Sequence, residues 1–176
     1  MNAPQVETKL SGRASRASQA RNDCKLLIEG VTVSAHSAVM GKVIVKLKLT
    51  NLKDAFLKSA GTRKAKPRAV EVEALVDTGA TRLYLKPTVI KRLGLERTDT
   101  VRSQITNGEA LRFKYGPVQL ELMGRKENFD VIEVPESVPN LLGQAPLQVL
   151  DFVVDSKGHK LIPNPAHGGE QKTEEY

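Results

Sequence analysis

One stretch of the sequence has the residue types needed to hold a carboxylate in a fixed position. The apolar run Ala74-Leu75-Val76 leads directly into Asp77-Thr78-Gly79, followed by Ala80. An acid at the end of a buried strand is costly unless it is paired or used. Thr78 can hydrogen-bond to the backbone, and Gly79 lets the chain turn sharply. The pattern therefore favours a carboxylate that faces a cleft, where it could activate water.

The segment from Leu75 to Ala80 resembles the active-site turn of the retropepsin-like aspartic peptidases. Asp-Thr-Gly alone occurs by chance in many proteins, so the resemblance depends on further parts in the right order. A hairpin is predicted around the turn residues Thr106, Asn107, Gly108 and Glu109, because Asn-Gly is a strong hairpin signal. An ordinary surface hairpin would give the same pattern. In the resembled family, the hairpin at this place is the flap that closes over substrate.

A third matching part is Leu141-Leu142-Gly143. In the resembled family, two apolar residues followed by glycine lie beside the catalytic turn, and the glycine allows close approach to its backbone. A plain strand end would explain Leu142-Gly143 alone. The ordered set of turn, short helix, hairpin, strand pair and apolar-apolar-Gly is more specific than any single motif.

The resemblance implies hydrolysis of peptide bonds by two carboxylates that share one proton. Two close acids cannot both ionise cheaply, so such a pair titrates as a unit. The chain offers a single Asp-Thr-Gly at Asp77. The second carboxylate must then come from another copy, which implies a two-fold symmetric homodimer. By resemblance, Thr78 would hydrogen-bond across the two-fold axis.

Periodicity predicts an all-β fold with one or two short helices, and the resemblance implies a single-lobe, retropepsin-like closed β-barrel. Alternating apolar residues predict strands, and Pro87 with Gly94 brackets a short helix. The expected strands cover 43–50, 70–76, 83–85, 118–122, 128–134, 151–155 and 160–162, with the hairpin over 100–115 and helices over 87–94 and 146–150.

The sequence predicts one folded domain between two tails. Residues 1–25 are rich in Ala, Ser, Arg, Asn and Gln and predict a disordered tail. The peptidase domain is expected over 26–165, with a surface insertion at 51–68. Residues 166–176 are polar and predict a flexible C-terminal tail.

The positive charge is concentrated in one part of the chain. The net charge is +7, and residues 41–70 carry nine Lys and Arg against one acid, Asp54. Contact with nucleic acid would explain this stretch, and so would a solvated basic loop and edge strand. The solvated interpretation is favoured because no aromatic residues are interleaved for base stacking.

Other chemistries have little support. Cys24 is the only cysteine, which excludes an internal disulfide and fits a reducing cytoplasm. His36, His159 and His167 lack the spacing of a metal site, and no cofactor motif is present, so neither a metal nor a cofactor is expected. No apolar run approaches the length of about 20 residues that spans a bilayer.

The sequence thus predicts a cytoplasmic, homodimeric aspartic endopeptidase acting on a peptide or protein substrate. The alternative is a dimeric binding or scaffold module that kept the fold but not efficient hydrolysis, because fold does not fix function. A third alternative is a basic protein that associates with nucleic acid.

Overall fold

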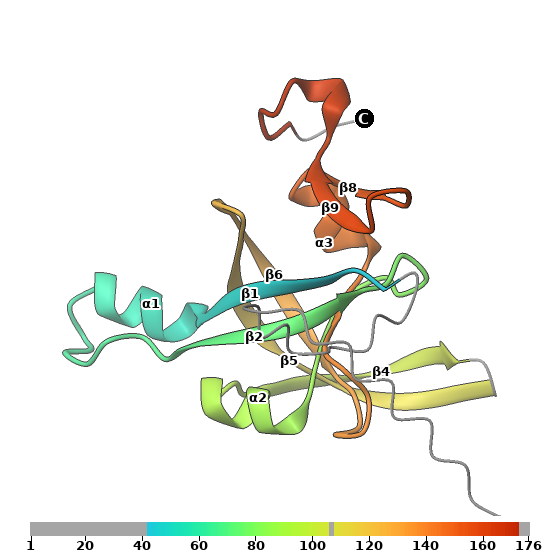
Figure 1. Cartoon of the computed structure of the whole chain (residues 1–176). Helices are drawn as coiled ribbons and strands as arrows, with labels where there is room; N and C mark the ends of the chain where they lie inside the picture. Colours follow the sequence, from blue (N-terminus) through green and yellow to red (C-terminus); the bar gives the residue numbers. More distant parts are fainter. Residues whose placement is uncertain (1–41, 106–107, 173–176) are drawn as a thin grey trace, which may run out of the picture. The chain divides into compact units, whose positions relative to one another are not determined.

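The computed structural model describes residues 42–105 and 108–172 (Figure 1). Several predictions fall outside these residues: the tail at 1–25, the start of the domain expected from residue 26, and the hairpin-tip residues Thr106 and Asn107. Among the helices of the described ranges, none has both the length and the apolar character to cross a membrane.

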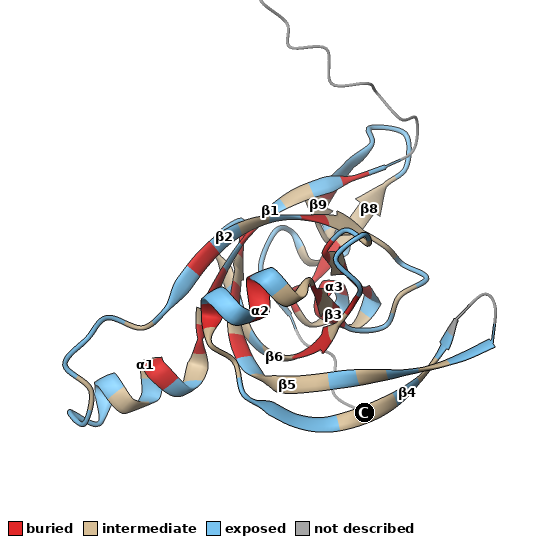
Figure 2. Cartoon of the chain, turned by 90° about the horizontal axis from the view of Figure 1, so that it is seen from below, coloured by how far each residue is buried: buried red, intermediate tan, exposed pale blue. Residues whose placement is uncertain are grey.

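The strands form a seven-stranded sheet that closes on itself (Figure 2). Its order is β1 (Ile44–Asn51), β2 (Ala69–Val76), β7 (Leu141–Leu142), β3 (Leu83–Leu85), β6 (Arg125–Glu133), β5 (Gly108–Leu122) and β4 (Arg97–Ile105). Because β5 also pairs with β1, every strand except β4 belongs to a ring. The predicted all-β, closed-barrel fold is confirmed.

Buried and exposed side chains alternate along β1, and the buried ones form part of the core inside the ring. Leu47 and Leu49 are buried, whereas Lys46 and Lys48, which alternate with them, are exposed. Successive side chains of a strand point to opposite faces, so one face of β1 packs inside the ring. Most of the remaining core consists of Val, Leu and Ile from the other strands.

Short helices cover the ring where the sequence predicts them, with small shifts in their bounds. Helix α2 (Pro87–Leu93) has Pro at its start and ends at Gly94, whose φ of 58° is left-handed. Helix α3 (Gln144–Val149) begins two residues earlier than predicted. It is followed by a separate two-stranded sheet of β8 (Phe152–Asp155) and β9 (Lys160–Pro163).

The hairpin arm and the strand predicted after it are one continuous element. Strand β5 runs for 15 residues, with a register shift against β6 between Tyr115 and Val118. The turn into β6 uses Met123 and Gly124, both at positive φ, so β6 begins at Arg125, three residues before the strand predicted at 128–134. Such a two-residue turn matches the twist of the paired strands.

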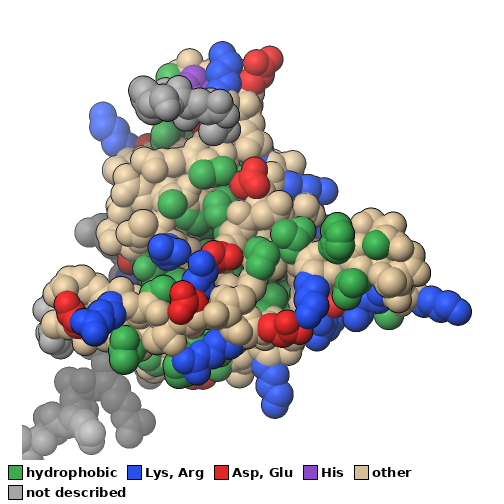
Figure 3. Space-filling model, turned by 180° about the vertical axis from the view of Figure 1, so that it is seen from behind, with side chains coloured by type: hydrophobic (Ala, Val, Ile, Leu, Met, Phe, Trp, Pro, Cys, Tyr) green, Lys and Arg blue, Asp and Glu red, His purple; other side chains and the backbone are tan. Residues whose placement is uncertain are grey.

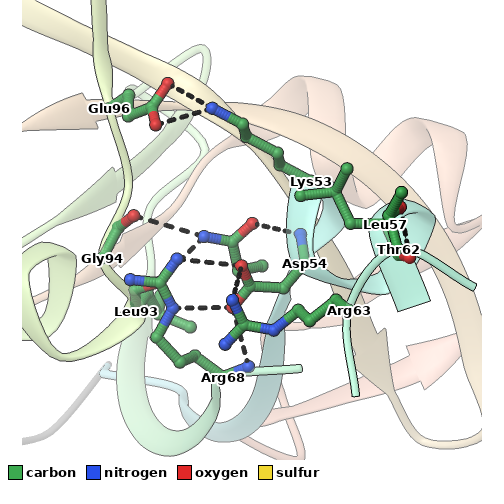
Figure 4. A network of polar contacts seen from close by, with 10 residues as sticks. Lys53, Asp54, Leu57, Thr62, Arg63, Arg68, Leu93, Gly94 and Glu96 are labelled. Carbon is green, nitrogen blue, oxygen red and sulfur yellow. Dashed lines mark hydrogen bonds and ion pairs between the residues drawn. The ribbon is translucent and has the colours of Figure 1, made fainter. Parts of the chain in front are cut away.

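The predicted surface insertion at 51–68 contains an ordered helix anchored by a buried acid. Helix α1 (Leu52–Ser59) starts at Asn51, whose side chain accepts a hydrogen bond from the Asp54 amide at 3.0 Å. Asp54 is 2% exposed and accepts bonds from Arg68 Nε at 2.6 Å and Nη2 at 2.9 Å (Figure 4). Arg63 Nη1 lies 3.3 Å from the same carboxylate. These contacts hold the two ends of the insertion together.

Replacement of Asp54 by Asn is expected to lower the stability of the fold by about 2–3 kcal/mol. Loss of one partner of a fully buried pair costs more, but the Arg68 side chain is 42% exposed. Thermal or urea unfolding measures this change. The exposed Asp99→Asn substitution is the matched control and should unfold like the wild type.

The same ion pair predicts how stability depends on pH. The hydrogen bonds from Arg68 outweigh the opposing effect of burial and lower the pKa of Asp54 to about 2. The pair therefore contributes fully above about pH 4, the range of an unfolded Asp, and is lost as pH falls through about 2. Lowering the pH between these two values should reduce the free energy of unfolding of the wild type more than that of the Asp54→Asn variant. An equal pH dependence in the two proteins would show that the Asp54 pair does not cause the loss.

Several cations of the basic stretch 41–70 have acidic partners. Lys48 Nζ lies 3.2 Å from Glu121, and Lys53 Nζ lies 2.6 Å from Glu96. Viewed from behind, Lys and Arg side chains are interspersed with acidic and apolar ones (Figure 3). On this face the cations therefore form no continuous basic surface.

The described part of the predicted flexible tail packs on the fold as far as Lys172. A single 3₁₀ turn spans Pro165–His167, and His167 Nδ1 lies 2.9 Å from buried Asp151 Oδ2. Arg125 Nη2 donates to the Gly169 carbonyl at 2.8 Å. The difference from the prediction arises because the polar tail residues supply hydrogen bonds to a buried acid. Composition alone does not reveal this pairing.

Candidate active site

Strand β2 delivers Asp77 to the end of the ring. β2 pairs in parallel with β7, where Leu75 and Val76 face Leu141 and Leu142. The Asp77 amide then donates to the Leu142 carbonyl at 3.0 Å. The backbone hydrogen bonds of the sheet therefore extend to Asp77 and fix its position.

The turn after β2 orients the Asp77 carboxylate through a backbone hydrogen bond. The Gly79 amide donates to Asp77 Oδ1 at 2.9 Å, and the Ala80 amide donates to the Asp77 carbonyl at 3.1 Å. A Cβ at Gly79 would lie 3.2 Å from the same Oδ1, which is tighter than ordinary contact. Asp77 is half-buried, whereas Thr78 and Gly79 are exposed.

The segment after β7 passes directly against the active-site turn. The Gly143 amide donates to the Arg82 carbonyl at 3.0 Å, and the Gln144 amide donates to the Ala80 carbonyl at 2.7 Å. A Cβ at Gly143 would lie less than 3.0 Å from three backbone atoms of Ala80 and Arg82. Only a glycine fits without displacing this backbone. The backbone that Gly143 meets lies just after Asp-Thr-Gly.

Asn140 is a positioning residue that sequence reasoning missed. It is 7% exposed, and its Nδ2 donates to the Glu73 carbonyl at 2.9 Å. Its Oδ1 accepts from the Lys86 amide at 3.0 Å. The side chain thus ties β2 to the start of α2. The only sign of this role in the sequence is that Asn140, a polar residue, directly precedes the apolar pair Leu141-Leu142.

A cleft of about 820 Å³ lies in front of Asp77. One side is formed by the active-site turn and β3, and the other by the hairpin of β4 and β5. Its walls include Asp77, Gly79, Ala80, Thr81, Arg82, Tyr84, Val101, Arg102, Ser103, Gln104, Arg112, Val134, Val138 and Leu141. The structure therefore brings the predicted acid and the predicted flap hairpin to one cleft.

Some predicted site residues lie elsewhere. Leu142 and Gly143 are buried behind the turn. Thr78 lines a separate hollow with residues of α3 and β8. Gly108 and Glu109 are exposed near the end of the hairpin, and Glu109 lines another small hollow beside Arg102. Several cleft residues were not predicted, because only the strand register shows which way they face.

Asp77 is the sole carboxylate among the described residues that line this cleft. Where carboxylates alone move the protons of a hydrolysis, one must be ionised to take a proton from water and another protonated to give a proton to the carbonyl oxygen. One carboxylate cannot hold both states at once. The cleft therefore presents one carboxylate, and a reaction that uses two would require a second from outside the described lining.

Comparison with known proteins gives one family match. A family described as aspartyl protease matches residues 64–145, from the segment before β2 to the start of α3. The match contains the acid turn, the hairpin and the close-packed glycine segment. No curated protein matches the chain.

Proposed function

We propose that this chain, which across residues 64–145 is a retropepsin-like aspartyl protease, acts as a homodimeric aspartic endopeptidase. The family match supports aspartic protease function in general. The observation that carries the finer proposal is that Asp77 and the inner side of hairpin β4–β5 line a single cleft. A cleft of this kind can hold an extended peptide between a fixed acid and a covering hairpin.

In the proposed reaction, the two Asp77 carboxylates share one proton. The ionised carboxylate takes a proton from water as the water oxygen attacks the peptide carbonyl carbon. The protonated carboxylate gives its proton to the carbonyl oxygen, so a neutral tetrahedral intermediate forms. The carboxyl group protonated in the first step then gives its proton to the amide nitrogen, while the other carboxylate takes the proton of one hydroxyl of the intermediate. The C–N bond breaks, a new carboxyl and a free amine leave, and the pair again shares one proton. The Gly79 amide would keep each carboxylate oriented throughout.

The face that carries Thr78 is the proposed contact between the two copies. Thr78 is exposed one residue after the acid, and it lies at a hollow of about 410 Å³ shared with Gln144, Leu147 and Phe152. A two-fold axis close to Thr78 would bring both acids together. It would also add β8 to the contact between the chains.

We place the enzyme in the cytoplasm, since Cys24 is the only cysteine and forms no internal disulfide. The proposal includes the flap tip at Thr106 to Glu109. Of these residues, Thr106 and Asn107 lie outside the described part of the chain.

A cleavage assay with a mixed peptide library, carried out at several pH values, tests the proposal. Wild-type protein should cut peptides, a statine-type inhibitor should block the cleavage, and sedimentation should give a dimer. If the protein is a dimer that binds peptides but cuts none at any pH, the proposal is wrong. The binding or scaffold alternative would then hold.

A further inference from the structure

The cleft in front of Asp77 is positively charged. Arg82, Arg102 and Arg112 line it together with the single acid. Arg82 follows the active-site turn, whereas the other two come from opposite strands of the hairpin. A ligand between the turn and the hairpin therefore meets cations on both sides.

Two of these three arginines have no acidic partner among the described residues. Arg102 faces Glu109 at 3.9 Å, and both side chains are mostly exposed. For Arg82 and Arg112, no carboxylate of the described residues lies within 4.0 Å of the guanidinium. Four of the eight arginines among the described residues have such a partner, Arg102 included. Arg63 and Arg68 pair with Asp54, and Arg125 pairs with Asp151.

The register of the β4–β5 pair places the Arg112 side chain on the face of the hairpin that lines the cleft. Arg112 lies directly opposite Val101 in the β4–β5 pair, so their side chains share one face. Both are half-buried, whereas the preceding Leu111 is 70% exposed on the other face. Lys114 follows on the same face, and Asp130 neutralises it at 2.5 Å. Arg112 is therefore the unpaired cation of the inner hairpin face among the described residues.

Arg82 belongs to the fixed wall of the cleft. Its carbonyl accepts from Gly143, and the next residue begins β3, which pairs with β6 and β7. Arg82 thus belongs to a wall held by the sheet, whereas Arg112 belongs to the hairpin. A ligand that pairs with both would hold the hairpin over the active-site turn.

We infer that this cleft selects peptides with Glu or Asp close to the bond that is cut, an inference that rests on the proposed function. Arginine pairs with carboxylates through two parallel hydrogen bonds, which gives both affinity and orientation. In a two-fold dimer each protomer contributes Arg82 and Arg112. Acidic residues on both sides of the scissile bond therefore fit best.

Peptide rather than RNA is favoured as the ligand because of the other cleft residues. Tyr84 is the single aromatic residue among the described residues that line the cleft. Proteins that bind single-stranded nucleic acid combine a basic groove with several aromatic side chains on which successive bases stack, and the described lining of this cleft lacks the second feature. Strand β4 at the sheet edge instead offers backbone groups that can pair with an extended peptide.

A binding experiment with the Asp77→Asn protein tests the inference without cleavage. The probes are two labelled decapeptides with the same central apolar pair, flanked on both sides by Glu in one and Gln in the other. Fluorescence anisotropy should show the Glu peptide binding about tenfold or more tightly at low salt, with the preference shrinking as salt rises. Equal affinities would overturn the inference. Displacement of the Glu peptide by a lower concentration of an RNA oligomer would also overturn it.

Charge-matched variants assign the preference to the cleft. In the same Asp77→Asn background, Arg82→Gln and Arg112→Gln should each reduce the preference for Glu several-fold. Arg92→Gln removes the same charge from the exposed end of α2 and should leave the preference unchanged. An equal loss in all three variants would point to net charge alone and contradict the inference.

Cleavage by the wild-type protein separates this inference from the proposed function. If the Gln peptide is cut as efficiently as the Glu peptide, the preference is absent although the chain is a peptidase. If the Glu peptide binds tightly but neither peptide is cut, the cleft selects acidic ligands and the proposed activity is wrong.

Discussion

The Asp77→Asn variant is expected to lose peptide cleavage by about 10⁴-fold or more, with its fold and dimer unchanged. An amide cannot take a proton from water, and in a homodimer the substitution removes both carboxylates together. The Asn side-chain oxygen can still accept the bond that Gly79 donates to Asp77 Oδ1. The loss should therefore appear in kcat rather than in stability.

This expectation is checked by kcat and KM on one cut peptide, with circular dichroism and sedimentation on the same samples. Asp99→Asn serves as the control, because it makes the same chemical change on an exposed residue of β4. It should keep wild-type kcat. Substantial cleavage by a correctly folded Asp77→Asn dimer would show that another group performs the chemistry.

The second large effect is expected from Gly143→Ala. A Cβ there would lie under 3.0 Å from the Ala80 carbonyl and from two backbone atoms of Arg82. These are backbone atoms, so the clash cannot be relieved by rotating a side chain. We expect a loss of about 2–3 kcal/mol in stability and about 100-fold in kcat/KM, because the turn that holds Asp77 must move.

Gly116→Ala is the matched control for this effect. Gly116 lies within β5, has no positive φ, and its added Cβ would meet nothing closer than 3.7 Å. It should therefore change stability and kcat/KM little. If Gly143→Ala had the unfolding midpoint and kcat/KM of the wild type, the close packing behind the turn would not matter for activity.

The parts of the fold that follow from local pattern were predictable from the sequence. Alternating Leu and Val residues identified β1 and β2, and Pro87 with Gly94 bracketed α2. Asp77 was singled out by an apolar strand that ends in Asp-Thr-Gly. Each of these signals lies within about eight neighbouring residues, so no knowledge of tertiary contacts was needed.

The parts that depend on distant partners were not predictable. Asp54 looked like a lone acid in a basic surface loop, but Arg68, fourteen residues later, buries and pairs with it. The C-terminal segment looked flexible because its contact with Asp151 cannot be read from composition. Likewise, Arg112 faces the cleft only because of the register between β4 and β5.

A subunit-mixing titration tests the central claim that two chains share one acid pair. Wild-type protein at fixed concentration is allowed to exchange subunits with a tenfold excess of the Asp77→Asn chain, and peptide cleavage is then measured. If active sites need Asp77 from both copies, activity should fall to about a tenth, because most wild-type chains sit in mixed dimers. Undiminished activity after complete exchange would show that one Asp77 suffices and would contradict the account.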